Sequence, residues 1–337
     1  MTTHANWFER LTGFAEQTGP EGYAANQAQL EVVGEQLRSR VNGRQYGIGR
    51  LELVSLKALR ERALAGPPVP GQPLRRVVVG EARALHQRPE LAGALFQVAS
   101  QFNLLEMIGE QITPEHGVAR YAEDPTQGPA CAMAAGAATI YRNYLVPVGG
   151  QLGQRTNRQL DGFADLGACV AHALGATPDE LWTMRNGYAM FKPGAVQRMS
   201  AHVASLSPAQ YDELMQSLRI GLHWDVEVTD SPQSPGPRVS QAFCSALPIS
   251  YNRHLQDNWA PLARLILQGC YEATLWAGVI NAQQGKSKVV LLTSVGGGVF
   301  GNDRAWIEQA MDRAIEATAG YGLDVVRVDR YGAVRRR

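Results

Sequence analysis

The chain has 337 residues, of which 45% are hydrophobic and 19% are charged. This composition supports a sizeable buried core and argues against global disorder. Lys and Arg number 32 and Asp and Glu 31, so the formal net charge is +1, which gives no support for binding nucleic acid or a membrane surface through bulk charge.

No window approaches the roughly 18 apolar residues that a membrane helix needs. Residues 1–7 lack a basic segment followed by an apolar one, so no signal peptide is predicted and the expected location is the cytoplasm. The four cysteines form no CxxC pair and the seven histidines show no HExxH spacing. We therefore expect no metal and no cofactor, and cysteines that are small buried residues in a reducing cytosol.

The first part of the chain is predicted to be helical up to about residue 65. Apolar residues recur at helical spacing over 24–41 and again over 51–64. The Pro- and Gly-rich residues 65–71 predict a linker. A strand over 74–79 and a second apolar run over 91–100 follow, and then an Ala- and Gly-rich helix at 128–141, whose small side chains allow close approach.

Residues 150–230 are predicted to be a helical insertion. Capping boxes at Thr177 with Glu180 and at Ser207 with Gln210 mark two helix starts. The segments predicted after these helices are a strand at 223–229, a loop at 231–237, a strand at 239–247, a long helix at 259–281, a buried strand at 288–293, a helix at 306–319 and a final strand at 323–328. Strands that alternate with helices favour a layered α/β sheet.

The strongest chemical signal follows the buried strand at 288–293. Four glycines stand within six residues, namely Gly296, Gly297, Gly298 and Gly301, and a helix follows soon after. Glycines let successive backbone N–H groups turn toward one anion, and a helix N-terminus adds a positive dipole. The pattern predicts a diphosphate site, with a tight turn without ligand as the alternative. It fits neither the Rossmann nor the P-loop motif.

These segments together resemble a macrodomain. The strand, the Gly-Val-Phe-Gly of residues 298–301, the next helix and the final strand are similar to the second phosphate loop and last strand of that family. Residues 77–81 (Val-Val-Val-Gly-Glu) resemble the strand that ends in Gly-Asp beside the adenine amino group. Residues 96–103 resemble the next strand, which ends near the distal ribose, and the long helix at 259–281 also matches.

The resemblance covers about residues 74–145 and 238–330. It implies a three-layer α/β/α macrodomain with a mixed sheet, built from residues 71–149 and 231–337. Residues 1–70 are then an N-terminal helical extension, and residues 150–230 are the helical insertion.

The first loop departs from the common macrodomain hydrolases, which carry a run of glycines there. Here residues 123–129 read Glu-Asp-Pro-Thr-Gln-Gly-Pro, with Gln-Phe-Asn-x-x-Glu upstream at 101–106. This combination resembles the larger atypical macrodomains of bacterial effectors, which remove ADP-ribose from arginine. The chain also lacks the Gln-Glu-Glu triplet expected of poly(ADP-ribose) glycohydrolases.

The resemblance implies a catalytic group and a ligand-binding group of residues. The catalytic group is Asn103, Glu106 and Asp124, because carboxylates near the distal ribose can stabilise oxocarbenium-like charge or activate water. The ligand-binding group is Glu81, at the adenine, together with Thr126, Gln127, Gly128, Gly296, Gly297, Gly298, Val299, Phe300, Gly301 and Asn302.

Plainer interpretations remain open for the polar residues of both groups. Glu81 could be a solvated charge and Asn103 an ordinary residue at the end of a strand. Glu106 could lie on the surface of a helix, and Asp124 could be a turn former before Pro125. Outside the two groups, Arg142 could reach a phosphate.

The expected function is an ADP-ribosyl hydrolase that removes mono-ADP-ribose from a modified protein, with arginine as the expected linkage. Its partners would be ADP-ribose or an ADP-ribosylated protein. The alternatives are a non-catalytic reader of ADP-ribose and, more weakly, a nucleotide-binding structural protein whose insertion recruits a partner.

Overall fold

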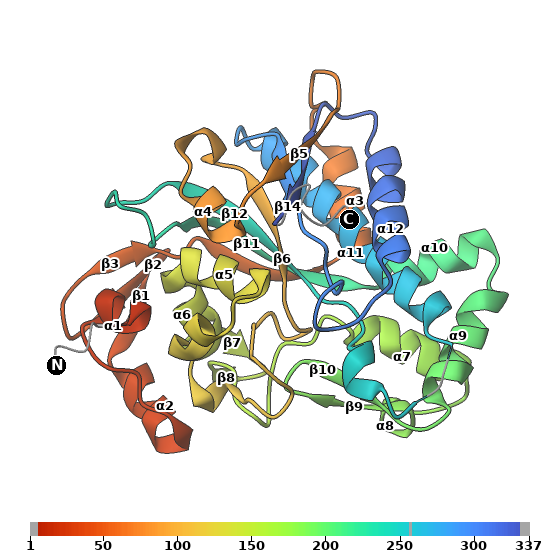
Figure 1. The fold of residues 1–337 in the computed structure, drawn as a ribbon, viewed down its shortest axis with the longest axis horizontal. Coiled ribbons are helices and arrows are strands. Elements are labelled where there is room, and N and C mark those ends of the chain that lie inside the picture. Colours follow the sequence, from red (N-terminus) through yellow and green to blue (C-terminus); the bar gives the residue numbers. More distant parts are fainter. Residues whose placement is uncertain (1–5, 256–257, 331–337) are drawn as a thin grey trace, which may run out of the picture.

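The computed structural model of the protein describes residues 6–255 and 258–330. Its centre is a seven-stranded mixed sheet in the order β4-β11-β12-β6-β13-β14-β5 (Figure 1). Five strands from β12 to β5 run parallel, and β11 is antiparallel to both of its neighbours. The strands are β4 (Arg50–Ser55), β5 (Leu74–Val79), β6 (Leu95–Ala99), β11 (Arg219–Glu227), β12 (Arg238–Cys244), β13 (Val289–Leu292) and β14 (Asp324–Asp329).

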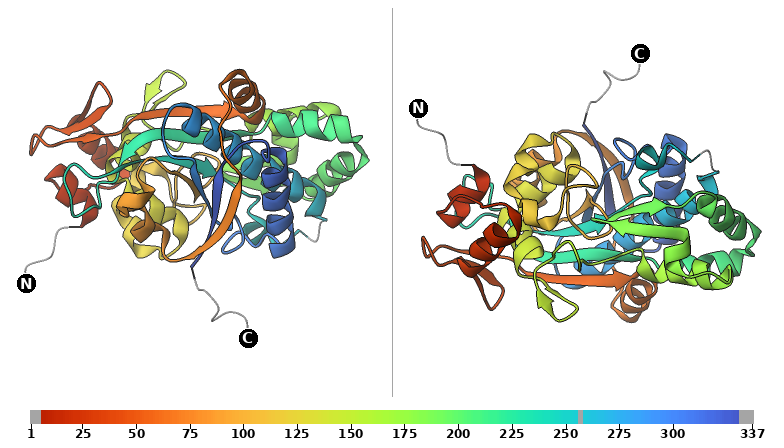
Figure 2. Two further views of the ribbon diagram at one scale, coloured as in Figure 1. Left: turned by 90° about the horizontal axis from the view of Figure 1, so that it is seen from above. Right: turned by 90° about the horizontal axis from the view of Figure 1, so that it is seen from below.

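Helices cover both faces of this sheet, as the parallel strands require (Figure 2). One face packs against α3, α11 and α12 in the largest hydrophobic cluster. The opposite face packs against α4, α5 and α6 through two smaller clusters. The predicted three-layer α/β/α arrangement is therefore confirmed. The helices are α3 (Leu56–Ala65), α4 (Ala82–His86), α5 (Gln127–Ala134), α6 (Gly136–Tyr144), α11 (Ala260–Gln283) and α12 (Arg304–Ala317).

The N-terminal segment is helical only in part, so the prediction of a helical extension needs correction. Helices α1 (Trp7–Thr12) and α2 (Gly19–Ala28) are followed by a small antiparallel sheet of β1 (Leu30–Val33), β2 (Gln36–Ser39) and β3 (Gln45–Gly47). Gly34, with φ +61°, allows the turn that ends the helical pattern of 24–41. The first residues of the pattern at 51–64 instead pair with β11 as strand β4.

The insertion keeps its predicted helix starts and its predicted strand at 223–229, which is part of β11, and adds short strands that were not predicted. Both capping boxes are present, at α8 (Pro178–Leu181) and α10 (Pro208–Gln216). Between them, β9 (Trp182–Arg185) and β10 (Tyr188–Phe191) form a hairpin, and the end of the insertion forms β11 of the central sheet. The remaining elements of this region are β7 (Pro147–Val148), β8 (Gln151–Leu152), α7 (Ala164–Ala173) and α9 (Ala195–Ser205).

The C-terminal half follows the prediction closely, from β12 through α11, β13 and α12 to β14.

Cys131, Cys244 and Cys270 are buried as expected, but Cys169 on α7 is exposed, so the expectation of burial is wrong there. Among the described residues no helix combines the length and hydropathy needed to cross a membrane. The same residues contain no group of His, Cys, Asp and Glu arranged to hold a metal ion.

Candidate active site

The predicted site segments gather along one edge of the sheet, because the five parallel strands end there (Figures 1 and 2). Ligands of open α/β sheets bind outside the carboxyl ends of the strands. The segments that leave these ends contain Glu81 after β5, Arg330 after β14, residues 294–302 after β13, residues 100–110 after β6 and residues 245–251 after β12. We call residues 294–302 the glycine loop and residues 100–110 the strand-end segment.

Gly296 and Gly301 allow the backbone turns of the glycine loop, and Gly298 leaves room beside the loop for a ligand. Gly296 and Gly301 have φ of +73° and +76°, a region that side chains other than glycine rarely adopt. A Cβ atom on Gly296 would lie 2.4 Å from the Cβ of Ala246, and one on Gly301 would lie 2.3 Å from Ser250 Oγ. A Cβ on Gly298 would meet nothing within 4 Å, so the loop is open at that residue.

The open part of the loop carries hydrogen-bond donors. The N–H groups of Gly297, Gly301 and Asn302 donate to carbonyls within the loop, over 3.0–3.2 Å. Those of residues 298–300 have no acceptor in the described part of the chain. Helix α12 begins just beyond, at Arg304. Three consecutive free amides beside a helix N-terminus are suited to an anion.

The loop before α5 is held by local contacts. Asp124 Oδ1 accepts the N–H of Thr126 at 2.8 Å, which is the turn-forming interaction. Its side chain is half-buried, and Gln127 is half-buried too. Gly128 packs against the end of β6, because a Cβ there would lie 2.2 Å from the carbonyl oxygen of Ala99. Asp124 and Gly128 thus have structural roles, and their predicted contacts with a ligand remain predictions.

Arg330, which the sequence did not single out, lies beside Glu81, the predicted adenine-binding residue. The Glu81 side chain is 51% exposed, and its Oε1 lies 3.7 Å from Arg330 Nη2. Arg330 also donates to the carbonyl of Pro125. Arg330 therefore connects the end of β5 with the loop before α5.

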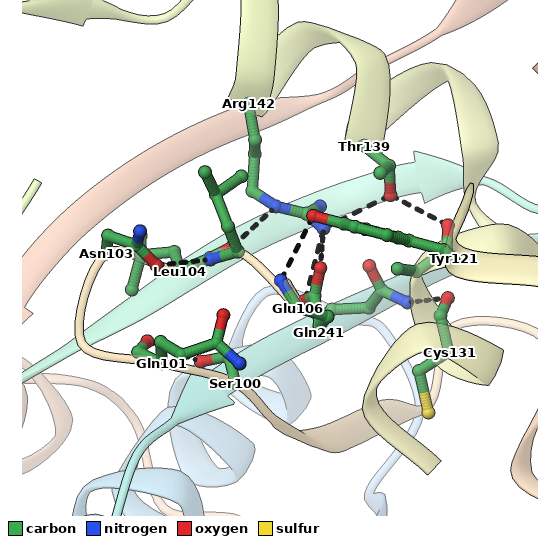
Figure 3. A network of polar contacts seen from close by, with 12 residues as sticks. Ser100, Gln101, Asn103, Leu104, Glu106, Tyr121, Cys131, Thr139, Arg142 and Gln241 are labelled. Atoms are coloured by element: carbon green, nitrogen blue, oxygen red, sulfur yellow. Dashed lines mark hydrogen bonds and ion pairs between the residues drawn. The ribbon is translucent and has the colours of Figure 1, made fainter. Parts of the chain in front are cut away.

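Glu106 is buried in an ion pair with Arg142 (Figure 3). Glu106 is 1% exposed, and Arg142 Nη2 lies 3.4 Å from both of its carboxylate oxygens. Arg142 Nε donates to the carbonyl of Leu104 at 3.1 Å, and the guanidinium lies 3.9 Å from the ring centroid of Phe243. Glu106 is thus no surface residue of a helix, and the fully buried Arg142 is not directed toward a phosphate in the solvent.

Burial raises the pKa of Glu106 to about 7, although Arg142 and Tyr121 act in the opposite direction. A buried carboxyl group with this pKa changes its charge near neutral pH. Its side chain is buried against Arg142 of α6, which suits a residue that anchors the strand-end segment more than one that contacts a ligand.

Asn103 is also fully buried and is held from two sides. Its Oδ1 accepts the N–H of Leu105 at 3.0 Å, and its Nδ2 donates to Gln159 of the insertion at 2.8 Å. The neighbouring Gln101 side chain accepts from the N–H of Met107 at 2.9 Å and donates to its carbonyl at 3.1 Å. The buried polar side chains of Gln101, Asn103 and Glu106 therefore find their partners inside the protein (Figure 3).

Two tyrosines that the sequence did not single out lie beside the glycine loop. Ring centroids of Tyr188 and Phe300 are 5.3 Å apart, those of Tyr251 and Phe300 are 5.8 Å apart, and those of the two tyrosines are 4.9 Å apart. We call these three rings the aromatic wall. The Asn186-Gly187 pair between two alternating apolar runs is a hairpin signal that could have located Tyr188, but nothing in the sequence placed it near Phe300.

Two surface grooves lie away from this edge. One of about 370 Å³ runs between β5, β14 and α12, and one of about 270 Å³ lies between α1, β3 and the residues after β11. Neither groove is lined by the glycine loop or by the loop before α5. The candidate site is therefore defined by convergent loops at the strand ends.

No family model and no curated protein matches the chain. Among solved structures, the poly(ADP-ribose) glycohydrolase from Thermomonospora curvata has a TM-score of 0.47 and 14% identity, over 93% of this chain and 92% of that one. The poly(ADP-ribose) glycohydrolase from Deinococcus radiodurans in complex with ADP-ribose has a TM-score of 0.46 and 11% identity, over 85% and 89%. Likenesses this distant transfer neither family membership nor activity to the chain.

Proposed function

We propose that the protein binds ADP-ribose along the strand ends and hydrolyses the bond between the distal ribose and a modified protein. The observation that carries the proposal is the open glycine loop, whose free amides at residues 298–300 stand at the same strand ends as Glu81. Arg330 joins Glu81 to the loop that contains Asp124, through the carbonyl of Pro125. This is the arrangement that the macrodomain-like motifs of the sequence imply.

In this proposal the glycine loop binds the diphosphate through its amides and the dipole of α12. The adenine lies toward β5, where the half-exposed carboxylate of Glu81 accepts from the exocyclic amine. The distal ribose lies toward the loop before α5. In this proposal the order of the strands therefore determines which end of the ADP-ribose lies at β5 and which lies at the loop before α5.

Hydrolysis breaks the glycosidic bond at the anomeric carbon, water supplies the new hydroxyl group, and the leaving group takes a proton. Positive charge develops on the ribose in the transition state, and a nearby carboxylate stabilises it or activates the water. Asp124 is the predicted catalytic carboxylate that is only half-buried. Glu106 and Asn103 are then positioning residues that hold the strand-end segment. The acidic loop before α5 supports arginine as the linkage, because a linked guanidinium is cationic.

A non-catalytic reader is the second candidate. It is favoured by the burial of two of the three predicted catalytic residues, Asn103 and Glu106. Such a protein would bind ADP-ribose by the same loop and leave the glycosidic bond intact.

Calorimetry with ADP-ribose and AMP tests the binding proposal. ADP-ribose is expected to bind with a micromolar Kd, about −8 kcal/mol, and AMP much more weakly because it lacks the distal ribose and one phosphate. Equal affinity for both ligands would rule out the proposed site. Incubation with arginine- and glutamate-linked ADP-ribosylated proteins then decides between hydrolase and reader, since a reader releases nothing from either.

A further inference from the structure

The strand order indicates where the group attached to the distal ribose would lie. From β5 the proposed ligand passes β14 and β13 and reaches β6, and the next strand is β12. Neighbouring strands are about 4.8 Å apart, so a group linked beyond the ribose comes to lie over the end of β12. The chain that leaves β12 contains Tyr251, in the short helix η4 (Ile249–Asn252).

The aromatic wall stands at this place and joins three distant segments. Phe300 belongs to the glycine loop, Tyr251 follows β12, and Tyr188 begins β10 of the insertion. The N–H of Ser250 donates to the carbonyl of Phe300 at 3.0 Å, which attaches η4 to the glycine loop. Tyr188 Oη donates to the carbonyl of Met107 at 3.0 Å, which attaches the wall to the strand-end segment.

The hairpin turn of the insertion fixes the strand-end segment against this wall. Asn103 Nδ2 donates to Gln159, Gln159 Nε2 donates to Asn186 Oδ1 at 3.0 Å, and Asn186 Nδ2 donates to the carbonyl of Glu110 at 2.8 Å. Gly187 has φ +81°, and a Cβ there would lie 2.6 Å from Asn103. The backbone of Glu110 is therefore placed by the insertion.

The surroundings of the wall are acidic. Burial raises the pKa of both Tyr188 and Tyr251, and the negative charges of Glu110 and Asp124 raise it further by smaller amounts. Within residues 6–255 and 258–330, no ion pair joins Glu110 or Asp124 to a basic side chain. Tyr188 is buried, whereas Tyr251 and Phe300 are partly exposed and are the rings that a ligand can reach. Aromatic faces beside carboxylates favour a planar cation such as a guanidinium group.

We propose that the aromatic wall and Glu110 form a specificity subsite that receives the linked side chain and prefers a guanidinium group. This inference rests on the proposed function, because it requires ADP-ribose on the glycine loop. It assigns the insertion a role in selecting the substrate, through its hairpin turn.

The test compares Glu110→Gln and Tyr251→Leu with wild type. The readouts are binding of free ADP-ribose and kcat/KM on proteins mono-ADP-ribosylated on arginine or on glutamate, with the Kd of the modified protein replacing kcat/KM if nothing is released. Both variants should bind free ADP-ribose as wild type does. On the arginine-linked substrate they should lose about tenfold, mainly through KM, since a charge-assisted or cation–π contact is lost. The glutamate-linked substrate should change far less.

Two further variants serve as controls, with folding checked by circular dichroism. Tyr251→Phe keeps the ring and should keep the preference for arginine, and Glu213→Gln removes a carboxylate from the remote helix α10 and should behave as wild type.

Equal losses on both linkages, or no loss on either, would overturn the subsite while ADP-ribose binding and turnover still support the proposed function. If wild type binds no ADP-ribose, both proposals fall.

Discussion

The glycine loop and the strand-end segment follow neighbouring parallel strands, β13 and β6, yet they differ in how their polar groups are satisfied. The glycine loop leaves the amides of residues 298–300 open, and a Cβ atom at Gly298 would meet nothing within 4 Å. In the strand-end segment, Asn103 and Glu106 are buried and paired. The insertion and α6 cover the end of β6. The segment after β13 is therefore open to a ligand, whereas the segment after β6 is buried and supports the site.

Removal of the Arg142 cation should have the largest effect on the molecule, and the effect should be on stability. Arg142→Met leaves the Glu106 carboxyl group buried without its partner, and such losses cost about 3–5 kcal/mol. Urea denaturation of wild type and variant measures this difference. The double variant Glu106→Gln/Arg142→Met should lose less than the sum of the single variants, because the two residues contact each other. A loss below about 1 kcal/mol in the single variant would show that the pair does not support the segment.

Gly298→Glu should affect binding and leave stability unchanged. Its carboxylate would occupy the proposed diphosphate position and repel the ligand, so ADP-ribose should bind at least about 100-fold more weakly, or about 2.7 kcal/mol. The free energy of unfolding should stay within about 0.5 kcal/mol of wild type, since a Cβ atom at this position meets no protein atom within 4 Å. Gly320→Glu, at another open glycine, is the matched control and should bind normally. If the Gly298→Glu protein is folded and binds ADP-ribose with normal affinity, the glycine loop is a turn that does not bind the diphosphate.

Substitution of Asp124 should lower the rate of hydrolysis and leave the affinity for ADP-ribose nearly unchanged. Asp124→Ala is expected to lower turnover by roughly 10²-fold, about 2.7 kcal/mol of barrier, with a far smaller change in ADP-ribose affinity. Asp124→Asn keeps an oxygen that can accept the N–H of Thr126, so an equal loss in this variant would assign the effect to charge rather than to the turn. Glu123→Gln, at the exposed neighbour, is the control. Full turnover in both Asp124 variants would contradict the assignment of this carboxylate.

The last expected effect is a pH dependence of stability that belongs to the strand-end segment. Because the pKa of Glu106 is raised from 4.5 to about 7, the folded state favours the protonated form. This contribution to stability is complete below about pH 4.5 and is lost as the pH rises to about 7. The free energy of unfolding of wild type relative to Glu106→Gln should fall across this window, by no more than about 3 kcal/mol. A difference between the two proteins that is constant from pH 4.5 to 8 would show that Glu106 titrates normally.

The prediction of the site from sequence succeeded best where the signal was local. Glycines after a buried strand fix a loop with open amides, because the backbone freedom belongs to the residues themselves. The carboxylates and Asn103 were identified as candidates, but the sequence could not predict whether their side chains are exposed. Burial depends on distant partners: Gln159 lies 56 residues from Asn103 in the chain, and Arg142 lies 36 residues from Glu106.

The sequence by itself determined the alternation of strands and helices, the glycine loop and the capped helices of the insertion, because periodicity, capping boxes and glycine act over a few neighbouring residues. Tertiary structure alone decided that residues 30–39 form a hairpin and that residues 50–55 pair with β11. It also decided that Glu106 is buried with Arg142, and that the insertion brings Tyr188 to Phe300. These outcomes depend on contacts between segments far apart in the chain, which no local pattern of residues specifies.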